Sequence, residues 1–229
     1  MTAPEQRQDD HAAPLDWRDG GVPVSQRFDD LYFSLEGGLE ETRHVFLAGN
    51  GLPGRFRPGF HVAELGFGTG LNLMATLIAH RAANAPAMRY TSFEAWPLPV
   101  EDIARALAAF PEALAVAAPF LEAWGAGLRR FALGTLEVEV RLGDVRQSLP
   151  RWQGSADAWF LDGFSPAKNP QMWGPDVMDA VARHAAPGGT FATYTAAGHV
   201  RSALETAGFT VGRAPGFGRK KHMTMGHLA

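Results

Sequence analysis

From residue 60 onward, short apolar runs alternate with segments of helical periodicity, and the connections between them are short. In 71–81, for example, Leu71, Met74 and Ile78 recur at a spacing that puts them on one face of a helix. Strands that are joined through helices pair in parallel, and helices then cover both faces of the sheet. The pattern therefore predicts an α/β fold of the Rossmann-like type, with a mostly parallel central sheet and helices on both faces.

The same reading gives expected elements and their order. Strands are expected at 60–65, 89–94, 130–133, 136–142, 156–161, 190–195, 209–213 and 223–228. Helices are expected at 39–47, 71–81, 100–110, 111–124, 145–149, 175–185 and 198–207. Gly134-Thr135 leaves open whether 130–142 is a hairpin or one interrupted strand. We expect 1–14 to be a mobile tail, 15–59 a small N-terminal extension, and 60–229 the Rossmann-like domain.

Composition excludes several kinds of site. The 229 residues contain no cysteine, which excludes disulfides, zinc–cysteine sites, iron–sulfur clusters and thiol nucleophiles. The eight histidines lack metal-ligand spacing, so no metal is expected. No apolar run is long enough to span a bilayer and the N-terminus has no signal-peptide core, so we expect a cytoplasmic protein without a membrane partner. A net charge of −3 counts mildly against a nucleic-acid partner, although a local basic face can still serve.

A glycine-rich loop, Glu64-Leu-Gly-Phe-Gly-Thr-Gly70, stands between an expected strand and helix. Glycines let the backbone turn sharply and let a ligand approach it closely. A dinucleotide fingerprint would need a glycine at position 71, where this chain has Leu71. The G-x-G-x-G spacing after an acid is instead typical of class I methyltransferases, which use S-adenosylmethionine. A strand-to-helix turn that needs glycine for packing is the structural alternative.

Further acids follow successive expected strands, where ligands of open α/β sheets bind. Glu94 can accept hydrogen bonds from both ribose hydroxyls of an adenosyl group, and Asp144 from the adenine amino group, although Asp144 also suits a helix N-cap. Tyr32 belongs to a segment that either closes over the cofactor or simply packs. The predicted cofactor-binding residues are Glu64, Gly66, Phe67, Gly68, Thr69, Gly70, Asn72, Glu94, Asp144, Asp162 and Tyr32.

The segment 159–170 combines acidic, aromatic, cationic and amide side chains within one expected loop. Asp162 follows an apolar strand, Phe164 can stack on a flat ring, and Lys168 and Asn169 add a cation and an amide. We predict that Asp162 and Phe164 are catalytic and that the loop is more than a turn with a capping aspartate. The loop resembles the catalytic loop of methyltransferases that act on exocyclic nitrogen.

Nearly the whole chain resembles the methyltransferase half of the bifunctional MnmC family, whose members complete 5-methylaminomethyl-2-thiouridine at the tRNA wobble position. The matching stretches are 27–34, 38–47, 64–72, 92–94, 160–170, 187–189 and 216–221. The resemblance implies methyl transfer from S-adenosylmethionine to the amine of 5-aminomethyl-2-thiouridine, with tRNA as partner. MnmC proteins usually continue into a flavin-dependent oxidase, so this chain is expected to be either a stand-alone transferase, with a separate oxidase acting in trans, or an excised domain.

Recognition of tRNA needs cations. The candidate substrate-binding residues are Lys168, Asn169, Arg219, Lys220 and Lys221, and Arg55 and Arg57 are further candidates. Each cation has the alternative of being a solvated surface charge. The last cluster reads Arg-Lys-Lys where the resemblance leads us to expect Arg-Lys-Arg.

Three other functions stay open. The same fold can methylate another amine, such as a polyamine or small metabolite. A nicotinamide-dependent oxidoreductase is opposed by the missing fingerprint glycine, and a non-catalytic RNA-binding module is opposed by the intact glycine loop and Asp162.

Overall fold

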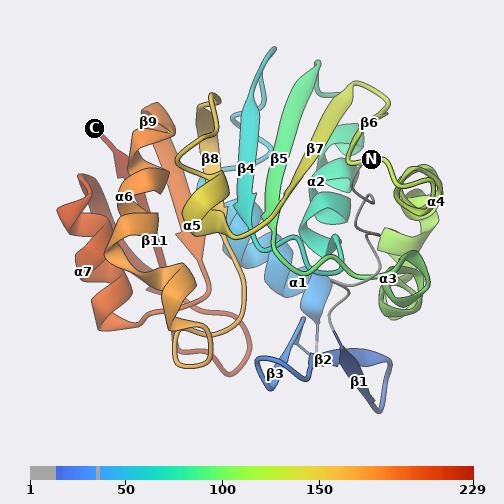
Figure 1. Cartoon of the computed structure of the whole chain (residues 1–229). Coiled ribbons are helices and arrows are strands. Elements are labelled where there is room, and N and C mark those ends of the chain that lie inside the picture. The colour runs from blue at the N-terminus through green and yellow to red at the C-terminus, as the bar shows by residue number, and fades with distance from the viewer. Residues whose placement is uncertain (1–13, 35–36) are drawn as a thin grey trace, which may run out of the picture.

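The computed structural model describes residues 14–34 and 37–229, and its centre is a single large sheet (Figure 1). The predicted tail lies outside the described residues except for Pro14. The strands of the large sheet are β4 (His61–Leu65), β5 (Met88–Glu94), β6 (Arg130–Leu133), β7 (Leu136–Leu142), β8 (Ala156–Leu161), β9 (Ala185–Thr193), β10 (Phe209–Pro215) and β11 (His222–Leu228). Their order is β10-β11-β9-β8-β4-β5-β7-β6. The predicted α/β fold is confirmed.

The five central strands, from β9 to β7, run parallel, and the edge strands β11, β10 and β6 run antiparallel to their neighbours. From β4 the chain moves outward to β5 and β7, and then crosses back to β8 and β9 on the other side. Strand order therefore reverses between β4 and β8. In open α/β sheets this reversal leaves a crevice at the carboxyl ends of the strands, where ligands bind.

Helices cover both faces, and each face has its own apolar core. Against one face pack α1 (Gly38–Thr42), a π-helix (Arg43–Leu47), a 3-10 helix (Ala48–Asn50), α2 (Leu71–Ala82), α3 (Val100–Leu107) and α4 (Pro111–Gly125). Against the other pack α5 (Val145–Ser148), a 3-10 helix (Pro170–Trp173), α6 (Pro175–Arg183) and α7 (Gly198–Thr206). Alternate residues of a strand point to opposite faces, so in β8 Phe160 enters the first core and Trp159 the second.

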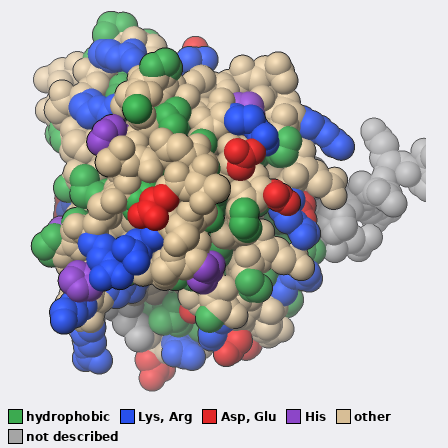
Figure 2. All heavy atoms as spheres, turned by 90° about the vertical axis from the view of Figure 1, so that its left-hand side faces the viewer, with side chains coloured by type: hydrophobic (Ala, Val, Ile, Leu, Met, Phe, Trp, Pro, Cys, Tyr) green, Lys and Arg blue, Asp and Glu red, His purple; other side chains and the backbone are tan. Residues whose placement is uncertain are grey.

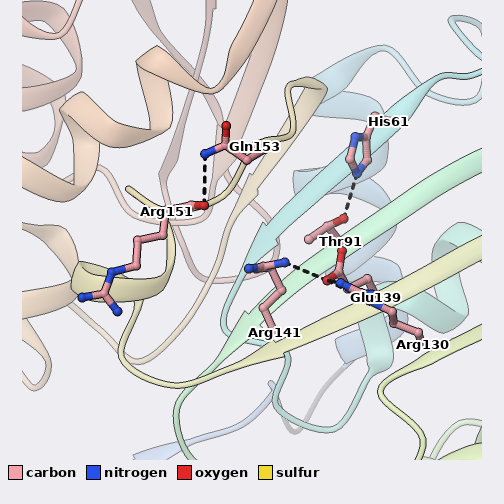
Figure 3. A network of polar contacts seen from close by, with 7 residues as sticks. All are labelled: His61, Thr91, Arg130, Glu139, Arg141, Arg151 and Gln153. Atoms are coloured by element: carbon pink, nitrogen blue, oxygen red, sulfur yellow. Dashed lines mark hydrogen bonds and ion pairs between the residues drawn. The ribbon is translucent and has the colours of Figure 1, made fainter.

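The segment 130–142 is a hairpin, which settles the alternative that its sequence left open. Its strands β6 and β7 pair antiparallel across Gly134-Thr135. Glu139 of β7 accepts hydrogen bonds from Arg130 of β6 and from Arg141 (Figure 3). These contacts lie on one face of the sheet and tie its edge strand to β7.

The strand β9 begins earlier than predicted. Its pairing with β8 shifts register between Ala156 and Ala158, which face Ala185 and Thr190. The extra residues of β9 include the Pro187-Gly188-Gly189 segment, which was predicted as a turn. A bulge absorbs these residues, so the strand continues through a sequence that reads as a turn.

An antiparallel sheet of β1 (Leu15–Arg18), β2 (Val22–Ser25) and β3 (Asp30–Leu31) lies below the carboxyl ends of the parallel strands in Figure 1. Residues 28–32, between β2 and α1, reach the loops that follow β4 and β8. The division of the chain at residue 59 stays a prediction. Within the described residues, no helix has the length and apolar character that a membrane span requires.

Candidate active site

A cavity of about 680 Å³ opens at the carboxyl edge of the sheet. Its walls come from the segments after β4, β5, β7 and β8 and from residues 27–34 of the N-terminal segment. The cavity therefore lies where strand order reverses. Among the predicted cofactor-binding residues, those that line it are Gly66, Phe67, Gly68, Thr69, Asn72, Glu94, Asp144, Asp162 and Tyr32. Glu64 and Gly70 do not.

The three positions of the loop require glycine for different structural reasons. All have positive φ, at 83°, 53° and 74° for Gly66, Gly68 and Gly70. A Cβ on Gly66 would lie 3.2 Å from the carbonyl oxygen of Asp162, so this glycine lets the loops after β4 and β8 approach each other. A Cβ on Gly70 would meet the Phe120 ring at 3.1 Å. Gly70 thus serves the packing of α2, whereas Gly66 and Gly68 face the cavity.

The carboxylate of Glu94 supports the glycine loop from the end of β5. It accepts hydrogen bonds from the backbone N–H of Gly68 at 2.9 Å and of Trp96 at 2.7 Å. Burial raises its pKa above the ordinary value, and these backbone bonds offset only part of that rise. Since a carboxylate has about four lone-pair sites, Glu94 retains acceptor capacity toward the cavity.

Asp144 is both a helix N-cap and a residue of the cavity wall, the two positions that the sequence left open for it. It caps α5 by accepting from the Arg146 backbone N–H at 2.9 Å, and it lines the cavity. The Arg146 guanidinium also pairs with this carboxylate and holds its pKa below the usual range. Asp144 therefore brings less free acceptor capacity to the cavity than Glu94 does.

Asn72 connects two carboxyl groups beneath and beside the cavity. Its amide nitrogen donates to Glu64 Oε1 and to Asp162 Oδ2, each at 2.8 Å, and its amide oxygen accepts from Thr42 at 3.0 Å. Glu64 is fully buried below the glycine loop. Its side chain acts through Asn72, which positions Asp162 at the cavity wall.

The two carboxyl groups differ in charge near neutral pH. Burial raises the pKa of Glu64 to about 8 and that of Asp162 to about 6. The backbone N–H of Gly163 and the Asn72 amide lower the Asp162 value. At pH 7, Asp162 is therefore mainly ionised, while Glu64 carries a proton.

Replacing Glu64 by glutamine flattens the pH dependence of stability. The pKa of this carboxyl is raised in the fold above its ordinary value of 4.5, to about 8, so between these values the folded protein binds the extra proton. Unfolding free energy then falls as pH rises through that window, by up to about 1.4 kcal/mol per pH unit. Glu64→Gln has no such proton to lose. Urea melts at pH 5 and pH 8 should show a smaller difference for the variant, and an equal one contradicts the assignment.

The other end of the cavity is aromatic. The Phe164 ring stacks on Phe28 with centroids 4.7 Å apart and meets the Tyr32 ring edge-on at 5.0 Å. The backbone N–H of Ser165 donates to Asp30 at 2.8 Å. The N-terminal segment and the loop after β8 thus hold each other, and both contribute to the same wall.

Only some of the predicted substrate-binding residues line the cavity. Asn169 and Lys220 line the cavity, whereas Lys168, Arg219 and Lys221 do not. Lys168 forms an ion pair with Asp29 at 2.9 Å. Arg219 and Lys221 are exposed, and neither forms an ion pair within residues 14–34 and 37–229.

Arg55 and Arg57 lie at the opposite, amino edge of the sheet. Arg55 donates to the carbonyl oxygens of Asn50 and Asp157, and Arg57 pairs with the Asp157 carboxylate at 2.6 Å. Asp157 lies near the start of β8, far along the strand from Asp162. These two arginines stabilise the fold locally and are remote from the cavity.

Among the cavity residues that were not predicted from the sequence are a glutamate and a tyrosine. Glu41 of α1 and Tyr194, directly after β9, both line the cavity. The rule that ligands bind at strand ends points to Tyr194, because it follows a parallel strand. Nothing in the local sequence around Glu41 distinguishes it from a solvated acid of an amphipathic helix.

The sequence profile of the family described as S-adenosyl-L-methionine-dependent methyltransferase matches residues 111–229, more than half of the chain. The chain belongs to this family. Its cofactor is S-adenosylmethionine, as the glycine loop predicted. The cavity fits this cofactor, since Gly66 and Gly68 line it and Glu94 offers carboxylate lone pairs at the neighbouring strand end.

Several relatives are bifunctional proteins. The methyltransferase chain is 44% identical over 237 residues to the tRNA 5-methylaminomethyl-2-thiouridine biosynthesis bifunctional protein MnmC of Aeromonas hydrophila, covering 96% of this chain and 36% of that protein. It is 48% identical to the MnmC of Caulobacter sp. strain K31, covering 93% and 38%. The chain thus spans little more than a third of these relatives.

Solved structures agree with the fold. The crystal structure of MNMC2 from Aquifex aeolicus superposes with a TM-score of 0.77 at 22% identity, covering 97% of this chain and 72% of that one. At this identity the match shows the fold. The predicted resemblance to the methyltransferase half of MnmC is confirmed by the relatives.

Proposed function

We propose that this methyltransferase transfers a methyl group to the primary amine of 5-aminomethyl-2-thiouridine at the tRNA wobble position, giving 5-methylaminomethyl-2-thiouridine. The observation that carries the proposal is the partly buried Asp162 carboxylate, which lies with an aromatic wall in the same cavity. The 44% and 48% identical relatives are named for biosynthesis of this nucleoside, which supports the choice of acceptor. A tRNA substrate also implies a cytoplasmic site of action.

The acceptor amine has to lose a proton before it can attack. A free alkylamine has a pKa of about 10, so at neutral pH it is mainly an ammonium ion. S-adenosylmethionine, when bound, supplies an electrophilic methyl group on a positive sulfonium. A buried site beside a positive charge lowers the pKa of an amine, because both disfavour a second cation.

Asp162 orients the amine. Its position is fixed by hydrogen bonds from Gly163 at 2.8 Å and from Asn72 at 2.8 Å. The remaining lone pairs accept an N–H of the acceptor amine and direct the nitrogen lone pair toward the methyl group. This is mainly an orientation effect, with acceptance of the proton second.

The aromatic wall suits a flat pyrimidine. Phe164 is held between Phe28 and Tyr32, so its ring plane is fixed by the N-terminal segment. A base extruded from an anticodon loop is commonly held by stacking on aromatic side chains. Phe164 thus positions the base while Asp162 positions its amine.

The proposal is tested by incubating the protein with methyl-labelled S-adenosylmethionine and tRNA carrying 5-aminomethyl-2-thiouridine, followed by nucleoside analysis. We expect label in 5-methylaminomethyl-2-thiouridine. tRNA with an unmodified wobble uridine is the control and should stay unlabelled. Label on a small amine but on neither tRNA would contradict the proposal in favour of a metabolite methyltransferase.

We further propose that a flavin-dependent oxidase supplies the aminomethyl substrate. Removal of a carboxymethyl group is an oxidation, and this sequence carries no dinucleotide fingerprint for a flavin. The bifunctional relatives are nearly three times as long as the region matched here. The oxidase therefore acts as a further domain or a separate protein.

Exposed cations beside the cavity are proposed to contact tRNA phosphates. Lys and Arg side chains gather toward the lower left of the face formed by the C-terminal elements (Figure 2). Arg219 and Lys221 are exposed and flank the cavity residue Lys220. Their position on either side of Lys220 in the chain supports a role in holding RNA that enters the cavity.

The double variant Arg219→Ala/Lys221→Ala should weaken tRNA binding and flatten its salt dependence. The slope of log K against log salt is negative, and each phosphate that a cation no longer neutralises reduces its magnitude by roughly 0.7 for single-stranded RNA. Titrations at several salt concentrations measure the slope, and Arg57→Ala at the opposite edge is the matched control. An unchanged slope in the double variant, or an equal change in Arg57→Ala, would place the RNA elsewhere.

A further inference from the structure

The ammonium group of Lys220 contacts two side chains of the cavity wall, a carboxylate and an aromatic ring. Its Nζ is 2.6 Å from Glu41 Oε1 and 4.4 Å from the centre of the Tyr194 ring. A carboxylate on one side and an aromatic face on the other is how proteins recognise a primary ammonium ion.

The two recognising groups are fixed by contacts of their own. The Glu41 side chain is only 11% exposed, and its other oxygen accepts from Ser34. The Tyr194 hydroxyl donates to the Gly163 carbonyl oxygen at 2.8 Å, which anchors the ring next to Asp162. Neither group depends on Lys220 for its position.

The cation is the less constrained partner. Lys220 comes from the turn between β10 and β11, and its side chain is 43% exposed. Because one end of this ion pair is open to solvent, the lysine ammonium can move into water when another ammonium ion takes its place beside the nearly buried Glu41.

We propose that Glu41 and Tyr194 form a binding subsite for the primary ammonium group of a ligand, and that Lys220 is a resident stand-in which the ligand displaces. This inference rests on the proposed function, because that function brings two such ligands to the cavity. One is the aminomethyl group of the acceptor uridine, and the other is the amino-acid end of S-adenosylmethionine. Both carry a primary amine that is protonated in water at neutral pH, before the acceptor amine loses its proton in the cavity.

Charge supports the exchange. Asp162 and Glu41 both line the cavity, and the Lys220 ammonium and the Glu41 carboxylate act on Asp162 in opposite senses. An incoming ammonium ion that replaces Lys220 keeps the same balance of charge around Asp162. The displaced lysine then lies free at the rim, next to Arg219 and Lys221.

Two pairs of probes separate the two sources. The first pair is 5′-(3-aminopropyl)thio-5′-deoxyadenosine and 5′-propylthio-5′-deoxyadenosine, which differ in the terminal amine and lack a carboxylate. The second pair is an anticodon stem–loop RNA with 5-aminomethyluridine or 5-hydroxymethyluridine at the wobble position. For each pair, calorimetric titration of the full chain gives the ratio of affinities with and without the amine.

We expect Glu41→Gln to reduce this ratio about tenfold in one of the two pairs, since a hydrogen bond to a charged group is being weakened. The pair affected identifies the ligand that uses the subsite. Glu40→Gln is the matched control, because Glu40 is on the same helix, 54% exposed in its side chain, and does not line the cavity. Unchanged ratios in both pairs would overturn the proposal.

Lys220→Met tests the stand-in role. It removes the resident ammonium and keeps an apolar chain of similar length, so the same ratio should rise. A ratio that falls as it does in Glu41→Gln would show that Lys220 is part of the subsite and overturn its role as a stand-in. Failure of the proposed function is seen separately, as an absence of methyl transfer by wild-type protein to the aminomethyl RNA.

Discussion

Asp162→Ala should lower the rate constant for methyl transfer by about 10²- to 10⁴-fold, because the group that orients the amine and can accept its proton is lost. The variant removes the only carboxylate that follows β8 at the cavity wall, and with it the hydrogen bond that orients the amine. Cofactor affinity should change far less, because Glu94 and the glycine loop stay in place. Single-turnover kinetics and a separate cofactor titration measure the two effects.

The pH profile gives a second reading of the same residue. Burial raises the pKa of Asp162 to about 6, and the carboxylate is the form that accepts a hydrogen bond from the amine. The wild-type rate should therefore fall as pH drops through about 6, and Asp162→Ala should lack that inflection. A wild-type rate in the variant, or an inflection that survives the substitution, would remove this role. Loss of rate together with loss of cofactor binding would indicate a collapsed site instead.

Local sequence patterns predicted the fold and most of the cofactor side of the cavity. A strand ends wherever an apolar run meets a glycine or an acid, and in a parallel sheet all such ends meet at one edge. Gly66, Glu94, Asp144 and Asp162 were found in this way, because each lies at or just after the end of its own strand. The hairpin at Gly134 could not be decided from the sequence, because neither β6 nor β7 alone indicates that the two strands pair.

The acceptor side depends on contacts between distant segments. Ser165 meets Asp30 across 135 positions of the chain, and Lys220 meets Glu41 across 179. No periodicity encodes such pairs. Three consecutive cations at 219–221 look alike in the sequence and all are exposed, yet only the middle one lines the cavity.

Glu64 shows the limit of a motif. Its position before the first glycine predicted a cofactor contact, and in the structure its side chain is fully buried and lies behind Asn72. The motif predicts an acid at this position. Only the packing shows whether that acid contacts the ligand itself or holds another residue that contacts the ligand. Its role in cofactor binding stays a prediction, one that acts through Asn72.

Glu94→Ala should weaken cofactor binding about 100-fold or more, because a carboxylate that accepts from both ribose hydroxyls makes two charge-assisted hydrogen bonds. Asp144→Ala should weaken it less, since Arg146 already engages that carboxylate. Titration with S-adenosylhomocysteine measures both losses. Glu94 also holds the backbone of Gly68 and Trp96, so a second ligand is needed: the 2′,3′-dideoxy analogue of S-adenosylhomocysteine. Wild-type protein should prefer the hydroxylated ligand, and Glu94→Ala should bind the two alike. If the variant keeps the wild-type preference, Glu94 only supports the loop, and the ribose is held by another group.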